Sequence, residues 1–141
     1  MTGGRAKSGT DSEVMAPRRT QRIGLALGSG AARGWAHIGV LRGLEEAGLQ
    51  PDVVCGTSMG AVVGAAYAAG KLDAFERWGR QLDRREMFAL FDLTLRGGLI
   101  KARRLFEFFE SVLPDRTIES LELPFAAVGT DLASGAEVWL R

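Results

Sequence analysis

One stretch constrains the fold of this chain more than any other. Residues 53–70 join a short apolar run, the pentapeptide GTSMG and a run of small apolar residues. The first run predicts a buried strand over 53–55, and the last predicts a helix that ends at Gly70. A serine between two glycines at a strand-to-helix turn is typical of a nucleophile elbow. Ser58 is therefore our candidate nucleophile, and a glycine-rich turn that serves packing alone is the alternative.

The residues around Ser58 suit attack on a carbonyl group. Gly56 and Gly60 lack the side chains that would collide where the helix folds back onto the strand. Thr57 and Met59 complete the elbow. The start of a helix carries a partial positive charge, and the Met59 amide is placed to donate a hydrogen bond to an oxyanion.

A second glycine-rich loop follows the first apolar run of the chain. Residues 22–27 predict a strand, residues 28–34 read GSGAARG, and residues 35–47 predict a helix that Gly48 ends. Backbone N–H groups at a helix start make such a loop a candidate anion site. Its GxGxxxG spacing, and the lack of an acidic residue at the end of the second strand, argue against dinucleotide binding. Because parallel strands end at one sheet edge, we expect this loop to supply oxyanion donors beside Ser58.

The general base is harder to assign. A hydrolase triad usually runs Ser, acid, His along the chain, but the sole histidine, His37, lies 21 residues before Ser58. We expect His37 to be structural. A serine hydroxyl can instead give its proton to a carboxylate within hydrogen-bond reach.

The composition is that of an ordinary globular domain. The 141 residues are 46% hydrophobic and 25% charged with a net charge of +1, so we expect no nucleic-acid partner. The uncharged run 59–70 is shorter than the roughly 20 residues of a bilayer span, and residues 1–21 lack the apolar core of a signal peptide. A cytoplasmic location is the expectation. The single cysteine, Cys55, has no partner for an internal disulfide and is predicted to be a buried thiol.

The rest of the chain divides into a tail and a folded part. Residues 1–21 contain almost no apolar side chains and are expected to form a disordered N-terminal tail, which leaves 22–141 as the domain. Hydrophobic periodicity predicts two more helices, over 72–85 and 102–113, and two more strands, over 125–129 and 137–140.

Residues 87–100 form an apolar segment with a Gly97-Gly98 hinge. This segment suits a flap over an acyl-chain pocket, in peripheral contact with the inner surface of a membrane. Core packing explains the same residues equally well. Both interpretations stay open at this point.

Three segments together resemble the bacterial single-domain branch of the patatin-like phospholipase family. They are 28–41 (GSGAARGWAHIGVL), 56–70 (GTSMGAVVGAAYAAG) and 125–139 (FAAVGTDLASGAEVW). The resemblance covers residues 22–141 and implies the N-terminal part of a three-layer α/β/α patatin-like fold with a mainly parallel sheet, incomplete at the C-terminus. It also implies a serine acyl hydrolase that acts on fatty-acyl esters of lipids through a Ser-Asp dyad, without a metal or cofactor.

The resemblance also assigns positions in the site. Ser58 matches the nucleophile of the family, and its oxyanion-loop motif matches Gly28, Ser29, Gly30, Ala31, Arg33 and Gly34. Many family members carry glycine where Ser29 and Ala31 stand. An alanine at position 31 disfavours a positive φ by about 1 kcal/mol.

The second catalytic residue of the family has no match in these residues. Its aspartate stands in an Asp-Gly turn, and this sequence contains no Asp-Gly dipeptide. Asp131 matches a different segment of the family, so we do not assign it as the base. The 141 residues alone are therefore expected to be weakly active or inactive. A non-catalytic regulatory or scaffold protein that keeps the fold, and an acyltransferase that uses the same elbow, are the alternative functions.

Overall fold

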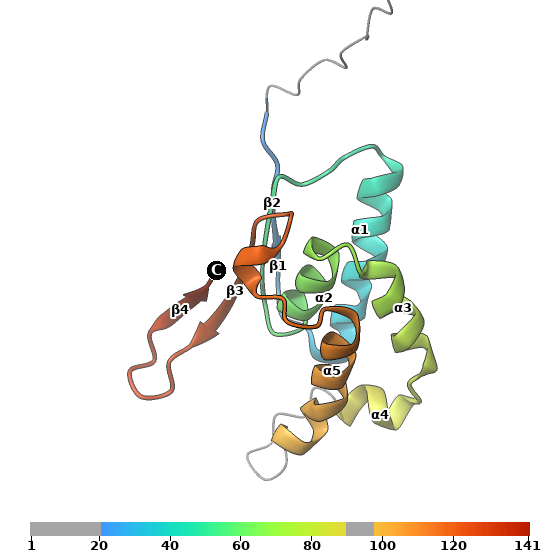
Figure 1. The fold of residues 1–141 in the computed structure, drawn as a ribbon, viewed down its shortest axis with the longest axis vertical. Coiled ribbons are helices and arrows are strands. Elements are labelled where there is room, and N and C mark those ends of the chain that lie inside the picture. Colours follow the sequence, from blue (N-terminus) through green and yellow to red (C-terminus); the bar gives the residue numbers. More distant parts are fainter. Residues whose placement is uncertain (1–20, 90–97) are drawn as a thin grey trace, which may run out of the picture.

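The computed structural model describes residues 21–89 and 98–141 (Figure 1). The predicted tail, except for its last residue, and the greater part of the proposed flap lie outside these ranges. The elements in chain order are β1 (Gly24–Leu27), the 3-10 helix η1 (Ala31–Trp35), α1 (Ala36–Glu46), β2 (Val53–Thr57), α2 (Met59–Ala68), α3 (Leu72–Gln81), α4 (Arg84–Ala89), α5 (Gly98–Val112), the 3-10 helix η2 (Ile118–Ser120), β3 (Phe125–Thr130) and β4 (Glu137–Leu140).

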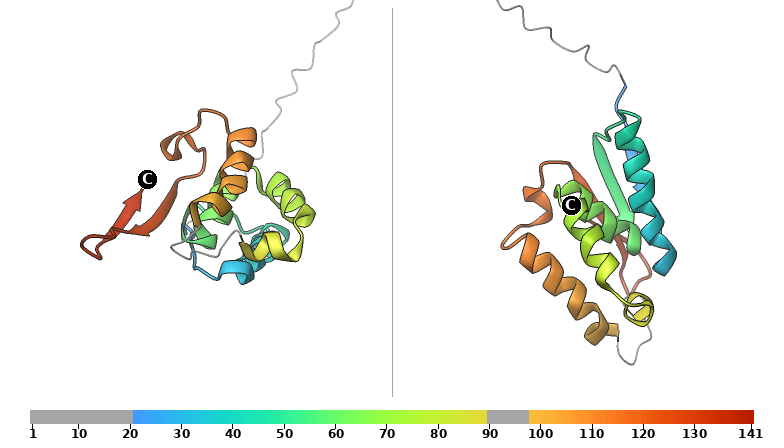
Figure 2. Two further views of the ribbon diagram at one scale, coloured as in Figure 1. Left: turned by 90° about the horizontal axis from the view of Figure 1, so that it is seen from below. Right: turned by 90° about the vertical axis from the view of Figure 1, so that its right-hand side faces the viewer.

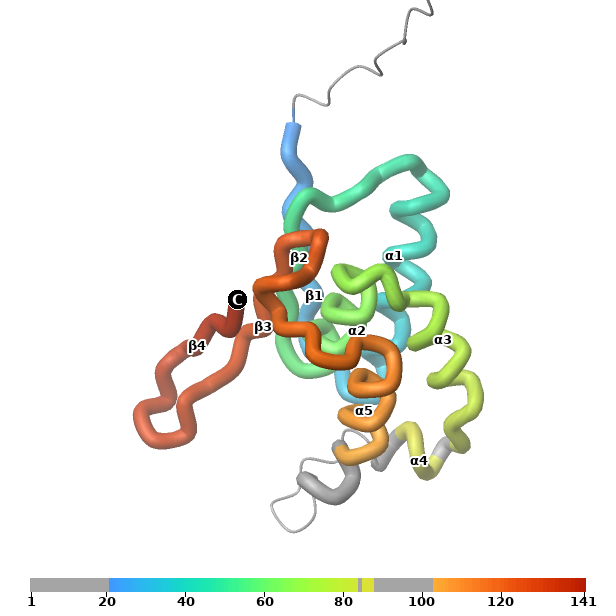
Figure 3. Tube along the Cα trace, viewed as in Figure 1, coloured from blue at the N-terminus to red at the C-terminus, as the bar shows by residue number. Residues whose placement is uncertain are grey.

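The four strands form one sheet in the order β1-β2-β3-β4. The first three run parallel, and β4 returns antiparallel to β3. Leu27 is in register with Gly56, and Val54 with Phe125. The chain trace in Figure 3 shows how β3 comes to lie beside β2 after the whole excursion through α2 to α5. The predicted α/β class with a mainly parallel sheet is confirmed.

All the described helices that flank the sheet lie on one side of it (Figure 2). The strand order explains this arrangement. The chain moves from β1 to β2 to β3 in one direction, and right-handed crossovers in one direction place their helices on the same face. Of the three layers expected, the described residues therefore supply two: the sheet and the helical layer on one face.

Two apolar clusters hold these layers together. Leu27, Val54 and Phe125 on the strands are buried against the small residues of α2. The second cluster centres on Phe75 of α3, which is fully buried and stacks on Trp35 with ring centroids 5.0 Å apart. Phe108 of α5 packs edge-on against Phe75 at 5.4 Å. The helical layer thus rests on α2 next to the sheet and on aromatic contacts further out.

The opposite face of the sheet is open in the described part of the chain. Val53 is 44% exposed and Trp139 of β4 is 49% exposed. Cys55 lies on the same face as Val53 and is partly exposed. The prediction that the Cys55 thiol is buried was wrong, because helices of the described part of the chain cover only the other face of β2.

Glycines end two helices as predicted. Gly48 after α1 and Gly70 after α2 have φ of 69° and 66°, the left-handed conformation that closes a helix. The single helix predicted over 72–85 was wrong, because the structure breaks it into α3 and α4. Asp83 caps α4: its carboxylate accepts the Glu86 N–H at 2.7 Å, and the Glu86 carboxylate accepts the Asp83 N–H at 3.1 Å.

Candidate functional site

The turn between β2 and α2 holds Ser58 in a strained conformation. Ser58 has φ 52° and ψ −125°, a region that non-glycine residues rarely occupy. Its side chain is exposed and makes no capping hydrogen bond to α2. Its carbonyl oxygen accepts the N–H groups of Ala61 and Val62, at 3.0 and 3.2 Å. The helix thus fixes the Ser58 backbone, while the exposed side chain makes no capping hydrogen bond to the helix.

The glycines of the turn allow very close backbone packing. A Cβ atom on Gly56 would lie 2.4 Å from the carbonyl carbon of Gly60. A Cβ atom on Gly60 would lie 2.1 Å from the carbonyl oxygen of Leu27 and 2.4 Å from that of Gly28. The first turn of α2 therefore lies directly against the end of β1 and the start of the glycine loop.

The glycine loop, residues 28–34, runs from β1 into η1. Arg33 N–H donates to the Gly30 carbonyl at 2.9 Å, and Ala31 has φ 46°. Gly34 is buried, and a Cβ atom there would lie 2.2 Å from Cγ of Met59. The loop thus touches the elbow at a second point.

The other predicted site residues lie around this junction, and they differ in exposure. Thr57 is the exposed last residue of β2, and Met59 is fully buried beneath Gly34. Ser29 and Arg33 are exposed on the glycine loop. The structure therefore brings the glycine loop and the elbow together at the carboxyl ends of the adjacent parallel strands β1 and β2.

His37 has a partner that the sequence pattern does not reveal. Its Nε2 lies 2.9 Å from the carbonyl oxygen of Gly28. A carbonyl oxygen only accepts, so Nε2 carries the proton and donates it. His37 ties the first turn of α1 back to the glycine loop. Its position one turn after the loop is the signal that would point to this contact.

Asp131 is held in the turn between β3 and β4. Its carboxylate accepts hydrogen bonds from the Ser134 N–H at 2.7 Å and the Ser134 hydroxyl at 2.6 Å. These bonds hold the pKa of the Asp131 carboxyl below its usual value. No acid in the described ranges hydrogen-bonds the Ser58 hydroxyl. The geometry gives Asp131 a structural place in the turn.

Residues 21–89 and 98–141 contain no group of three or more His, Cys, Asp or Glu side chains arranged to hold a metal ion. No helix in these ranges combines the length and the apolar character that crossing a bilayer requires.

Known proteins are similar to this chain in amino-acid sequence. The chain is 42% identical over 121 residues to an uncharacterised NTE family protein of Mycobacterium tuberculosis, an alignment that covers 85% of this chain and 34% of the relative. It is 36% identical over 120 residues to human patatin-like phospholipase domain-containing protein 6, covering 81% and 9%. With the neuropathy target esterase sws of Drosophila grimshawi the identity is 33% over 118 residues, covering 79% and 8%.

The chain thus spans about a third of the length of its mycobacterial relatives. The family model of the patatin-like phospholipases matches residues 25–138, which include the glycine loop, the elbow, β3 and the start of β4. This chain belongs to the patatin-like phospholipase family.

Proposed function

We propose that residues 22–141 carry the nucleophile and the oxyanion-binding loop of a serine acyl hydrolase. The observation that supports this proposal is the pairing of two features: an exposed serine at φ 52° on a strand-to-helix turn, and a glycine loop in backbone contact with that turn. A packing turn has no need of the strain at Ser58, which costs about 1–3 kcal/mol.

In the proposed reaction, Ser58 Oγ attacks the acyl carbonyl carbon of an ester and gives its proton to a base. The oxyanion that forms accepts hydrogen bonds from the Met59 N–H and from N–H groups of the glycine loop. Each such donor typically contributes about 3 kcal/mol to transition-state stabilisation. Collapse of the intermediate expels the alcohol with a proton from the base. Water then attacks the acyl-serine ester, releases the carboxylic acid and restores the Ser58 hydroxyl.

The base we propose is an aspartate from outside these 141 residues. The family places this aspartate in an Asp-Gly turn, which the sequence lacks. Asp131 is a poor substitute because Ser134 already occupies its carboxylate with two hydrogen bonds. Nε2 of His37 cannot take up the proton either, since it carries its own proton and donates it to the Gly28 carbonyl.

The proposed substrates are fatty-acyl esters of lipids. Two relatives are called a phospholipase domain-containing protein and an esterase, and both chemistries begin with attack on an acyl carbonyl. No cofactor is part of this mechanism. Peripheral contact with a membrane surface follows from the substrate, which resides there.

The experiment compares hydrolysis of p-nitrophenyl butyrate by the 141-residue chain and by a version continued to include an Asp-Gly turn. The longer version is expected to be the more active, and Ser58→Ala to lower its rate by at least about 1,000-fold. A fluorophosphonate probe should label Ser58. Ser111→Ala is the matched control, because the Ser111 hydroxyl is bound to the Phe108 carbonyl on α5.

Other results would contradict the proposal in distinct ways. Equal activity in both versions that survives Ser58→Ala would exclude Ser58 as the nucleophile. Absence of probe labelling in a folded, extended chain would favour a non-catalytic scaffold protein. Labelling with transfer of the acyl group to an added alcohol in preference to water would favour an acyltransferase.

A further inference from the structure

His37 holds a backbone carbonyl of the glycine loop. Its Nε2 donates a hydrogen bond to the carbonyl oxygen of Gly28 at 2.9 Å. Gly28 is the first residue of the loop, one peptide bond before Ser29. The same oxygen lies against α2, since a Cβ atom on Gly60 would stand 2.4 Å from it. The Gly28 carbonyl therefore faces the first turns of α1 and α2.

The direction of this carbonyl fixes the direction of the next N–H group. In a planar trans peptide the C=O and N–H bonds point in opposite directions. Because the Gly28 carbonyl faces the two helices, the Ser29 N–H points away from them, in an exposed part of the loop. If this peptide unit turned over, a carbonyl oxygen would point to that side and would repel an oxyanion.

Glycine at position 28 makes such a turn-over sterically easy. It requires a change in ψ of Gly28 and in φ of Ser29, and glycine has no Cβ atom to restrict its backbone. A Cβ atom added at Gly28 would meet nothing within 4 Å, so its surroundings do not restrict it either. A hydrogen bond from outside the loop is therefore needed to select one orientation, and His37 supplies such a bond.

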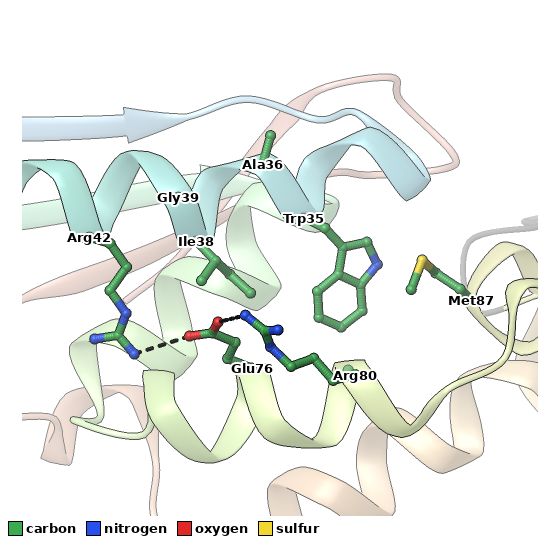
Figure 4. A pocket seen from close by; sticks show the side chains of 9 residues that line it. Trp35, Ala36, Ile38, Gly39, Arg42, Glu76, Arg80 and Met87 are labelled. Atoms are coloured by element: carbon green, nitrogen blue, oxygen red, sulfur yellow. Dashed lines mark hydrogen bonds and ion pairs between the residues drawn. The ribbon is translucent and has the colours of Figure 1, made fainter.

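The helix that carries His37 is itself anchored. Figure 4 shows Trp35 and Ile38, close to His37 in the sequence, directed towards α3. The Trp35 ring stacks on Phe75 of α3 with centroids 5.0 Å apart, and Ile38 is 7% exposed. The first turn of α1 thus has a fixed place on the helical layer. The imidazole, which is partly buried, presents its N–H to the loop from that place.

We propose that His37 is a positioning residue of the acyl-hydrolase centre. Its Nε2–H holds the Gly28–Ser29 peptide in the orientation that keeps the Ser29 N–H available to the oxyanion. This role rests on the proposed function of Ser58. His37 exchanges no proton with the substrate, because Nε2 keeps its proton throughout. Full negative charge on the oxygen develops only in the transition state, so loss of the His37 bond is expected to lower kcat and leave KM unchanged.

Two substitutions of similar length separate hydrogen bonding from bulk. Glutamine carries an N–H donor as many bonds from Cα as Nε2, whereas methionine fills similar space and donates nothing. Both form helices well. In the version continued to include an Asp-Gly turn, His37→Met is expected to lower kcat for p-nitrophenyl butyrate by roughly tenfold to 100-fold, somewhat less than outright removal of an oxyanion donor. His37→Gln should restore kcat to within about threefold of wild type.

Val40 provides the matched control on the same helix. It lies one turn after His37 and is 52% exposed. Val40→Gln and Val40→Met carry the same two side chains into solvent, so their kcat values should be equal. Urea unfolding of all four variants checks that any change in kcat is not a loss of folded protein.

A second measurement tests the hydrogen bond without any activity. His37 is the sole histidine, so the imidazole ¹⁵N signals of the 141-residue chain, made without added histidines, all belong to it. At alkaline pH, where an imidazole is neutral, these signals are expected to show the proton on Nε2. A proton on Nδ1 would overturn the proposal, because Nε2 could not then donate to Gly28.

The kinetic outcomes are equally decisive. Wild-type kcat in His37→Met would show that the loop needs no such bond. An equal loss of kcat in His37→Gln and His37→Met would refute positioning and would favour His37 as a base, which glutamine cannot replace. Either result, with hydrolysis that still requires Ser58, refutes the role of His37 alone. Hydrolysis that survives Ser58→Ala would instead refute the proposed function, and the role of His37 with it.

Discussion

Gly60 lies so close to Leu27 that a Cβ atom on Gly60 would stand 2.1 Å from the Leu27 carbonyl oxygen. Both groups are backbone, so neither can rotate away as a side chain would. This contact joins the first turn of α2 to the end of β1. It holds the elbow and the glycine loop at a fixed separation.

Gly60→Ala is therefore expected to lower the free energy of unfolding by more than about 3 kcal/mol, since β1 and α2 must separate to admit the methyl group. Urea unfolding followed by circular dichroism measures this. Gly43→Ala is the control: it adds a methyl group into open space on α1 and should raise stability by up to about 1 kcal/mol. Equal stability of the two variants would contradict the close contact.

The strain at Ser58 predicts a difference between two variants that both lack the hydroxyl. Glycine adopts φ 52° and ψ −125° freely and alanine does not. Ser58→Gly is expected to be more stable than Ser58→Ala by about 1 kcal/mol, after the extra backbone entropy of glycine in the unfolded state is subtracted. The urea concentrations at which half of each variant is unfolded give the difference in stability, provided that both variants have the same m-value. If alanine were the more stable replacement, position 58 would not be strained.

Much of the layout was predictable because local signals agreed with the tertiary structure. Gly48 and Gly70 end their helices in the left-handed conformation that their sequence positions predict. The strand predicted over 137–140 coincides with β4. Contact between the glycine loop and the elbow follows from the rule that parallel strands end at one edge of a sheet.

Other features depend on information that no single segment contains. Val53, Val54 and Cys55 are all apolar, so the pattern cannot tell which face of β2 is covered, and the burial of Cys55 was predicted wrongly. The amphipathic pattern over 72–85 did not reveal the break before α4. The capping-box spacing of Asp83 and Glu86 is the sequence signal that predicts a helix start there. The stacking of Trp35 on Phe75 depends on α3, which comes much later in the chain. The roles of Ser58 and of the glycine loop stay predictions.

Ala31 provides a test of the glycine loop itself. Its φ of 46° is unfavourable for alanine by about 1–2 kcal/mol. Ala31→Gly is expected to raise the free energy of unfolding by up to about 1 kcal/mol, because the relief of strain exceeds the added entropy of the unfolded chain. Thermal unfolding and urea unfolding both measure this change in stability. Ala32→Gly, the next residue in η1, has no positive φ to relieve and should lose about 0.5–1 kcal/mol.

Glu76 makes stability depend on pH. Hydrogen bonds from Arg80 and then Arg42 lower the pKa of its carboxyl below the ordinary value of 4.5. A carboxyl with a lowered folded-state pKa contributes stability above its unfolded value and loses it as the pH falls through the folded value. Wild type should therefore be more stable than Glu76→Gln at neutral pH, and the difference should vanish on acidification below 4.5.

Urea unfolding of both proteins across that pH range measures the difference directly. Glu122→Gln, at an exposed glutamate shortly before β3, is the control for the loss of one negative charge. Added salt should reduce the Glu76 effect only in part, because Arg42 also pairs with Asp73 and keeps α1 close to α3 when one bond is weakened. A Glu76→Gln difference that stays constant down to low pH would show that the charge of the Glu76 carboxylate contributes nothing to folding.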